Sequence, residues 1–178
     1  MEDTSMSLII RAAHFAAEKH KNQRRKDADA TPYINHPLTL AKILSLEADV
    51  RDPETLAAAI LHDTVEDTET TEQELVDNFG ANIARIVMEV TDDKSLPKAE
   101  RKRLQVANAA KKSPQAKLVK MADKIANLRD VAVSPPGTWP LERRQDYFDW
   151  AREVVQGLGD TNPRLAELFA KAYVARPK

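Results

Sequence analysis

The sequence contains no cysteine and only 4 glycines. Without cysteine, the protein has no disulfide framework, no thiolate metal site and no cysteine nucleophile, and it suits a reducing compartment. The apolar segment near the N-terminus is too short for a signal peptide, and no apolar run approaches the roughly 18 residues of a membrane span. A net charge of -1 gives no global attraction to nucleic acid or membrane. We therefore expect a cytoplasmic protein that binds neither.

The residues that are abundant favour helix. Of the 178 residues, 42% are hydrophobic and 31% are charged, with many Ala, Leu, Lys, Glu and Arg. Apolar side chains recur at helical spacing, and runs that alternate between apolar and polar residues are absent. The sequence predicts an all-α bundle of about eight or nine helices in one domain. The expected helices span residues 5–21, 37–47, 53–61, 71–80, 81–93, 97–112, 113–131, 139–158 and 162–173.

Four ionisable side chains stand at the end of an apolar helix, in the segment LHDTVED. Helix neighbours such as His62 and Asp63 do not face each other, but a backbone that turns at a helix end lets both reach one ion. Imidazole and carboxylate together suit a divalent ion such as Mn²⁺, Fe²⁺ or Zn²⁺. For this dipeptide alone, an ordinary surface pair at a helix end is the more common explanation.

Two distant residues favour the metal site. His36 lies in PYINHP, where prolines stiffen the loop and open the next helix. Asp123 lies in KLVKMADKIANLRD, which buries one apolar stripe and places Asp123 and Asn127 on another strip. For Asp123 alone, an exposed salt bridge is the alternative. His14 and His20 fall outside this pattern, and we expect His14 to be packed or half-buried.

The pattern H…HD…D of the HD-domain phosphohydrolases is similar, in order and spacing, to four residues of this chain: His36, His62, Asp63 and Asp123. The segments RRKDADATPYINHP, AAILHDTVEDT and KLVKMADKIANLRD resemble more narrowly the hydrolase domain of the RelA/SpoT family. Over about residues 5–175, the chain is similar to the stand-alone small alarmone hydrolases of the metazoan SpoT homologue type.

This resemblance implies an all-α, single HD-type phosphohydrolase domain over residues 1–178, with the four pattern residues as metal ligands. The implied cofactor is one Mn²⁺ ion, other divalent metals being open. The implied reaction removes the 3′-pyrophosphate of guanosine 3′,5′-bis(pyrophosphate), ppGpp or pppGpp, which gives GDP or GTP and pyrophosphate and ends stringent-response signalling.

The resemblance also implies that Glu66 and Asp67 are catalytic. A bound ion lowers the pKa of its water from ~15.7 toward ~7, and a nearby carboxylate then orients or deprotonates that water. From the residues alone, an acidic turn before the next helix is the favoured explanation of the pair.

Six further residues are implied in substrate binding. A guanidinium plane stacks well on a base, and basic groups suit the phosphates. Tyr147 either lines the substrate pocket or belongs to the apolar core of its helix. Lys124 and Arg129 are expected to be ion-pair partners of nearby acids. The six residues are Arg25, Lys26, Asn127, Lys98, Arg101 and Tyr147.

Three other functions stay open. The same site suits removal of the 2′-phosphate of NADPH, which has the same chemical demands. A catalytically silent alarmone-binding module would lack a metal ligand or a catalytic acid, but the four implied ligands and both implied acids, Glu66 and Asp67, are present. A structural bundle with an incidental motif would bind no metal. Because the chain ends at Lys178, we expect no synthetase or regulatory domain, whereas the oligomeric state is open.

Overall fold

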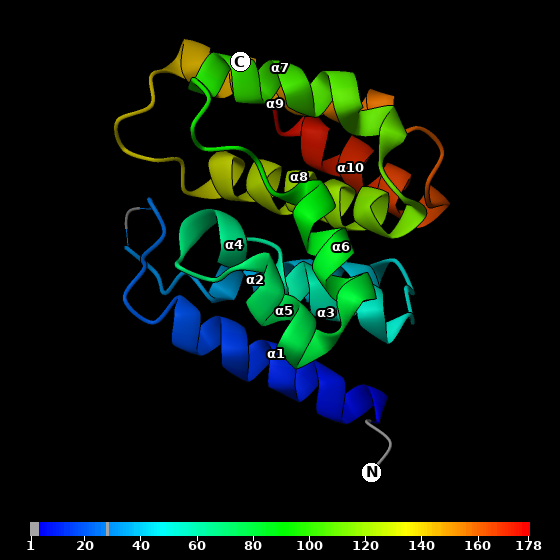
Figure 1. Ribbon diagram of the computed structural model, residues 1–178. Helices are drawn as coiled ribbons and strands as arrows, with labels where there is room; N and C mark the ends of the chain where they lie inside the picture. Colours follow the sequence, from blue (N-terminus) through cyan, green and yellow to red (C-terminus); the bar gives the residue numbers. More distant parts are fainter. Residues whose placement is uncertain (1–3, 28) are drawn as a thin grey trace.

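The computed structural model describes residues 4–27 and 29–178, and these form a helical bundle in two tiers (Figure 1). Its helices are α1 (Ser5–Lys19), α2 (Asn35–Lys42), α3 (Pro53–Leu61), α4 (Thr64–Asp67), α5 (Glu72–Phe79), α6 (Ala81–Val90), α7 (Lys98–Asn108), α8 (Pro114–Val133), α9 (Leu141–Leu158) and α10 (Pro163–Val174). A π-helix, Ile43–Glu47, continues α2, and a 3₁₀ turn, Ala109–Lys111, follows α7. Because the described residues contain no β-strand, the predicted all-α class is confirmed.

Local capping chemistry sets several helix ends. The Thr71 hydroxyl accepts a hydrogen bond from the Glu74 backbone N–H at 3.1 Å, which begins α5. Gly80 ends α5 with a φ of 85°, a conformation that glycine adopts without steric cost. The Ser113 hydroxyl accepts from the Ala116 N–H at 3.3 Å and begins α8. The predicted helix starts at Thr71 and Ser113 and the predicted stop at Gly80 are therefore confirmed.

Helix α8 lies between the two tiers (Figure 1). It packs against α2, α3 and α6 on one side and against α9 and α10 on the other. Met121, Ile125 and Leu128 are buried on it, as the predicted apolar stripe requires. Because α2, α3 and α8 meet, the start of α2, the end of α3 and the middle of α8 come together at one place.

The motif helix is interrupted where the sequence places the HD pair. The sequence predicts eight or nine helices, whereas residues 4–27 and 29–178 form ten α-helices because α4 is a separate single turn. Asp63 joins α3 to α4 with φ -102° and ψ 0°. The Thr64 hydroxyl donates to the Leu61 carbonyl at 2.7 Å and satisfies one end group of α3. This break allows His62 and Asp63 to face the same place.

One contiguous cluster of buried apolar side chains forms the core, from Ala12 in α1 to Ala172 in α10. Arg129 pairs with Glu47 at 2.8 Å, as expected of an ion-pair partner. The expectation for His14 is wrong, because its position on α1 leaves it exposed to solvent. Nowhere in the described part of the chain does a helix have the length and apolar character needed to cross a bilayer.

Candidate active site

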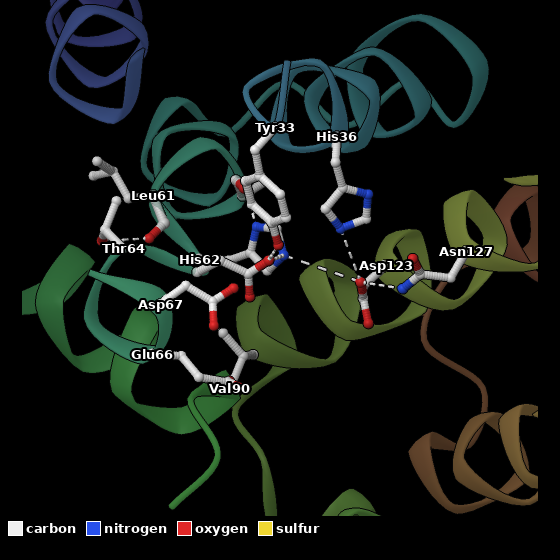
Figure 2. Close-up of polar contacts among 12 residues, drawn as sticks. Tyr33, His36, Leu61, His62, Thr64, Glu66, Asp67, Val90, Asp123 and Asn127 are labelled. Carbon is white, nitrogen blue, oxygen red and sulfur yellow. Dashed lines mark hydrogen bonds and ion pairs between the residues drawn. The ribbon is translucent and has the colours of Figure 1, made fainter. Parts of the chain in front are cut away.

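Three donor residues from three helices meet at one point. His36 near the start of α2, His62 just after α3 and Asp123 in α8 offer atoms that all lie within 4.8 Å of one another. Asp123 Oδ1 lies 3.2 Å from His36 Nε2 and 4.0 Å from His62 Nε2. Figure 2 shows these side chains converging from separate elements. Such a group can hold a divalent metal ion.

The hydrogen bonds of His62 leave one ring nitrogen available. Its Nδ1 lies 2.8 Å from the Ala59 carbonyl oxygen, to which it donates, so Nε2 carries the lone pair. Nε2 is buried without a hydrogen-bond partner among the described residues, although Asp63 Oδ2 lies 2.9 Å away. A lone pair that faces a carboxylate oxygen needs a proton or a cation between them. The residues of this group therefore fit a metal ion.

The fourth expected ligand, Asp63, lies beside this group and is held by a tyrosine. The Tyr33 hydroxyl donates to Asp63 Oδ2, the same oxygen that faces His62. Burial alone would raise the pKa of Asp63, but the nearby His62 and His36 hold it well below its usual value. Tyr33 lies in PYINHP but was not among the expected site residues, because the sequence does not distinguish it from a core aromatic.

Asp123 is not an exposed salt-bridge partner, since its side chain is only 13% exposed. Asn127 Nδ2 donates to Asp123 Oδ1 at 2.7 Å, and Lys124 Nζ lies 3.2 Å from Asp123 Oδ2. Burial opposes ionisation of Asp123, but Lys124 and the neighbouring groups keep its pKa well below the usual value. Arg25 donates to Asn127 Oδ1 at 3.4 Å, so Asn127 connects the metal-binding group to Arg25.

The two expected catalytic acids have different surroundings. Glu66 accepts a hydrogen bond from the Asp92 backbone N–H at 3.0 Å, and burial raises the pKa of Glu66 to about 7. Asp67 is paired with Lys94 and accepts from Gln23 Nε2 at 3.4 Å. A carboxyl group with a pKa near neutrality suits proton transfer. Lys94 and Gln23 were not predicted, because they reach Asp67 from distant parts of the chain.

A cavity of about 500 Å³ opens beside the metal-binding group. At the wall of this cavity, the Arg25 guanidinium lies over the Tyr33 ring, 5.9 Å from the ring centroid, and it pairs with Asp130 at 2.5 Å. This volume lies within the range of small-molecule sites. Four of the six expected substrate-binding residues line the cavity, together with one of the two expected catalytic acids: Arg25, Lys26, Asn127, Tyr147 and Asp67.

The other two expected binding residues, Lys98 and Arg101, line a second cavity of about 230 Å³. Trp139 and Tyr147 line both cavities and so mark where they adjoin. Burial and the neighbouring cations lower the pKa of Lys98, which reflects the density of positive charge there. Lys102, Arg143 and Trp150 also line this cavity and were not predicted as binding residues. A basic residue in sequence usually marks only a solvated face, which is why Lys102 and Arg143 were missed.

A sequence model of the HD domain matches residues 12–146, which includes all four pattern residues. The chain belongs to the HD-domain family. This confirms the resemblance seen in its motifs, and an HD-domain hydrolase implies a divalent metal ion. The donor atoms of His36, His62 and Asp123 are placed to hold one.

Full-length relatives narrow the position of the chain within the HD-domain family. It is 53% identical over 176 residues to the guanosine-3′,5′-bis(diphosphate) 3′-pyrophosphohydrolase MESH1 of Danio rerio, covering 99% of this chain and 98% of that protein. The MESH1 protein of Homo sapiens is 55% identical over 168 residues, 94% of each chain. The similarity therefore extends well beyond the HD motif.

Solved structures agree with this position. One described as a metazoan orthologue of SpoT that hydrolyses ppGpp and plays a role in starvation responses superposes with a TM-score of 0.92, at 48% identity and over 96% of both chains. The protein lmo0812 of Listeria monocytogenes is more distant, with a TM-score of 0.65 at 28% identity, over 80% of this chain and 96% of that one.

The raised pKa of Glu66 gives the HD site a measurable effect on stability. Because the folded-state pKa of about 7 exceeds the ordinary value of 4.5, the stabilising contribution of Glu66 is present below the ordinary value and is lost as pH rises through about 7. Glu66→Gln cannot ionise and keeps an acceptor for the Asp92 N–H. We compare the two proteins with a chelator present, so that no metal is bound. The free energy of unfolding of Glu66→Gln minus that of the unchanged protein should increase between about pH 5 and about pH 8.

Denaturant titrations at several pH values measure this difference. Glu153→Gln is the matched control, because Glu153 is exposed on α9. A stability difference for Glu66→Gln that stays constant across this pH range would contradict the assignment.

Proposed function

We propose that this chain hydrolyses the 3′-pyrophosphate of ppGpp or pppGpp, giving GDP or GTP and pyrophosphate. The observation that carries the proposal is a cavity lined by Arg25, Asp67 and Asn127 beside the metal-binding group, to which Asn127 is joined by its hydrogen bond to Asp123. The names of the MESH1 relatives and the description of the similar metazoan structure support the same substrate.

We propose Mn²⁺ as the ion and His36, His62, Asp63 and Asp123 as its ligands. Two imidazoles and two carboxylates form a mixed set that suits a borderline-hard divalent ion. Bound there, such an ion supplies Lewis acidity, which acidifies water and polarises a phosphoryl oxygen. Lys124 and Asn127 hold the Asp123 carboxylate, and Tyr33 holds Asp63.

The residues of the chain carry the proton steps. Water adds to the phosphorus attached to the 3′-oxygen, the bond between that phosphorus and the 3′-oxygen breaks, and the 3′-oxygen takes a proton from solvent and leaves as a hydroxyl. Glu66, with a pKa of about 7, takes the proton of the attacking water. Asp67, fixed by Lys94, orients that water.

The two adjoining cavities suit a nucleotide that carries phosphate on both sides of its ribose. Arg25 presents its guanidinium plane to the base while Asp130 and Asn127 fix it, and Lys26 lies next to it on the same wall. Lys98 and Arg101 in the second cavity contact the 5′-phosphates. Tyr147 lines both cavities and separates the nucleoside from those phosphates.

A second candidate substrate is NADPH, through its 2′-phosphate. The aromatic walls of the second cavity, Trp139 and Trp150, favour it because they can stack on the second ring system of a dinucleotide.

Purified protein incubated with Mn²⁺ and either ppGpp or NADPH tests both substrates, with Asp63→Ala as the inactive control. We expect ppGpp to yield GDP and pyrophosphate, and Asp63→Ala to lose this activity. Unchanged ppGpp, or a fully active Asp63→Ala, would overturn the proposal. Much faster turnover of NADPH would place the second candidate first.

A further inference from the structure

Tyr33 stands between the metal-binding group and the nucleotide cavity. It lies in the loop before α2, and Figure 2 shows its side chain reaching toward His62 alongside His36. Its hydroxyl donates to Asp63 Oδ2, and its ring centroid lies 5.9 Å from that of His36. On the cavity side, the Arg25 guanidinium lies 5.9 Å from the same ring. Tyr33 therefore contacts residues of both halves of the site.

The orientation of Asp63 does not come from its own helix. Asp63 occupies the N-cap position of α4, where an aspartate normally accepts a hydrogen bond from the first turn. Its side chain makes no such capping bond and instead turns toward His62 and the Tyr33 hydroxyl. The hydroxyl thus competes with local capping and keeps the carboxylate in the metal-binding group.

The Tyr33 ring is held independently of its hydroxyl. The His20 ring lies 4.8 Å from it, centroid to centroid, and His20 Nδ1 is 2.7 Å from Gln23 Oε1. Because Gln23 Nε2 donates to Asp67, its Oε1 accepts the His20 N–H. The ring therefore packs on a fixed imidazole, so removal of the hydroxyl alone leaves the support of Arg25 in place.

We propose that Tyr33 is a positioning residue with two separable effects. Its hydroxyl turns Asp63 away from the cap of α4 and toward the metal-binding group, and its ring supports Arg25 at the cavity wall. The effect on Arg25 rests on the proposed function, whereas the effect on Asp63 concerns metal affinity alone.

Two substitutions separate these effects. Tyr33→Phe keeps the ring and removes the hydroxyl, so we expect Mn²⁺ affinity to fall about 10- to 100-fold, as is usual when the partner of a metal ligand is lost. At saturating Mn²⁺, its KM for ppGpp stays within about twofold of the unchanged enzyme. Tyr33→Leu removes both the hydroxyl and the ring face under Arg25. We therefore expect the same loss of Mn²⁺ affinity and, at saturating Mn²⁺, a KM for ppGpp about tenfold higher than that of the unchanged enzyme.

Titration calorimetry and the electron paramagnetic resonance signal of free Mn²⁺ measure the affinity, and initial rates give KM and kcat. Tyr173→Phe is the matched control, because the Tyr173 hydroxyl bonds Asp149 at 2.7 Å on α9 rather than a site residue. In the Asp63→Ala background, Tyr33→Phe should cause no further loss of Mn²⁺ affinity.

Unchanged Mn²⁺ affinity in Tyr33→Phe, or an equal loss in the Asp63→Ala background, would overturn the role of the hydroxyl. Equal KM values for Tyr33→Phe and Tyr33→Leu would overturn the role of the ring. If ppGpp were not a substrate at all, the Mn²⁺ titrations would still decide the first effect. Failure of this inference is therefore distinguishable from failure of the proposed function.

Discussion

Replacing His62 by asparagine should remove Mn²⁺ binding and bring ppGpp hydrolysis down to background. His62 Nε2 is a buried nitrogen without a hydrogen-bond partner in the described part of the chain, and the bond from Nδ1 to the Ala59 carbonyl fixes the ring. Because loss of a residue that only supports a ligand costs about 10- to 100-fold in affinity, loss of the ligand itself should exceed about 100-fold. Elemental analysis and calorimetric titration measure the metal, and release of pyrophosphate measures the activity.

His14→Asn is the matched control, since the same replacement is then made at an exposed histidine on α1. We expect it to bind Mn²⁺ and to hydrolyse ppGpp like the unchanged protein. A His62→Asn protein that retained both properties would show that the histidine and aspartate group does not hold the ion.

Replacing Glu66 by glutamine should reduce kcat by about 10²- to 10⁴-fold, the usual contribution of a general base. Glutamine has nearly the same shape and can still accept the Asp92 N–H, but it cannot take a proton from water. Because Glu66 is not one of the grouped donors His36, His62 and Asp123, Mn²⁺ affinity should change by no more than a few-fold. Calorimetry and steady-state rates separate the two quantities.

The pH dependence gives a second test of the same residue. The ionised form of Glu66 is the active base, and bound Mn²⁺ lowers the pKa of about 7 that burial gives Glu66 in the metal-free site, so kcat in the unchanged enzyme should rise with pH at a value below about 7. Glu66→Gln should lose this rise along with its activity, whereas Glu153→Gln should keep both. A Glu66→Gln enzyme with near-normal kcat and the same pH profile would exclude Glu66 as the base.

Much of the fold follows from local signals. The caps at Thr71 and Ser113 and the stop at Gly80 depend on residues within one helical turn, so the sequence alone locates them. The buried stripe of α8 likewise follows from the 3.6-residue period. The backbone turn after Leu61 was expected from the sequence, but the separate helix α4 was not, because its four residues are too few to show a helical period.

The sequence by itself determined the helical class, and the resemblance of its His36, His62, Asp63 and Asp123 to the HD-domain pattern indicated the family that the domain match confirms. The helical class depends on residue types and on their periodicity along the chain, and the family depends on the match to a known motif.

Only the tertiary structure decided how the site is supported and divided. Tyr33 reaches Asp63 across 30 positions, and Lys94 reaches Asp67 across 27. The second cavity around Lys98 depends on how α7 lies against α9. Such contacts arise where helices pack, and a single sequence carries no local pattern for them. Until the helices are in place, any polar residue on a helix face or in a loop has many partners available.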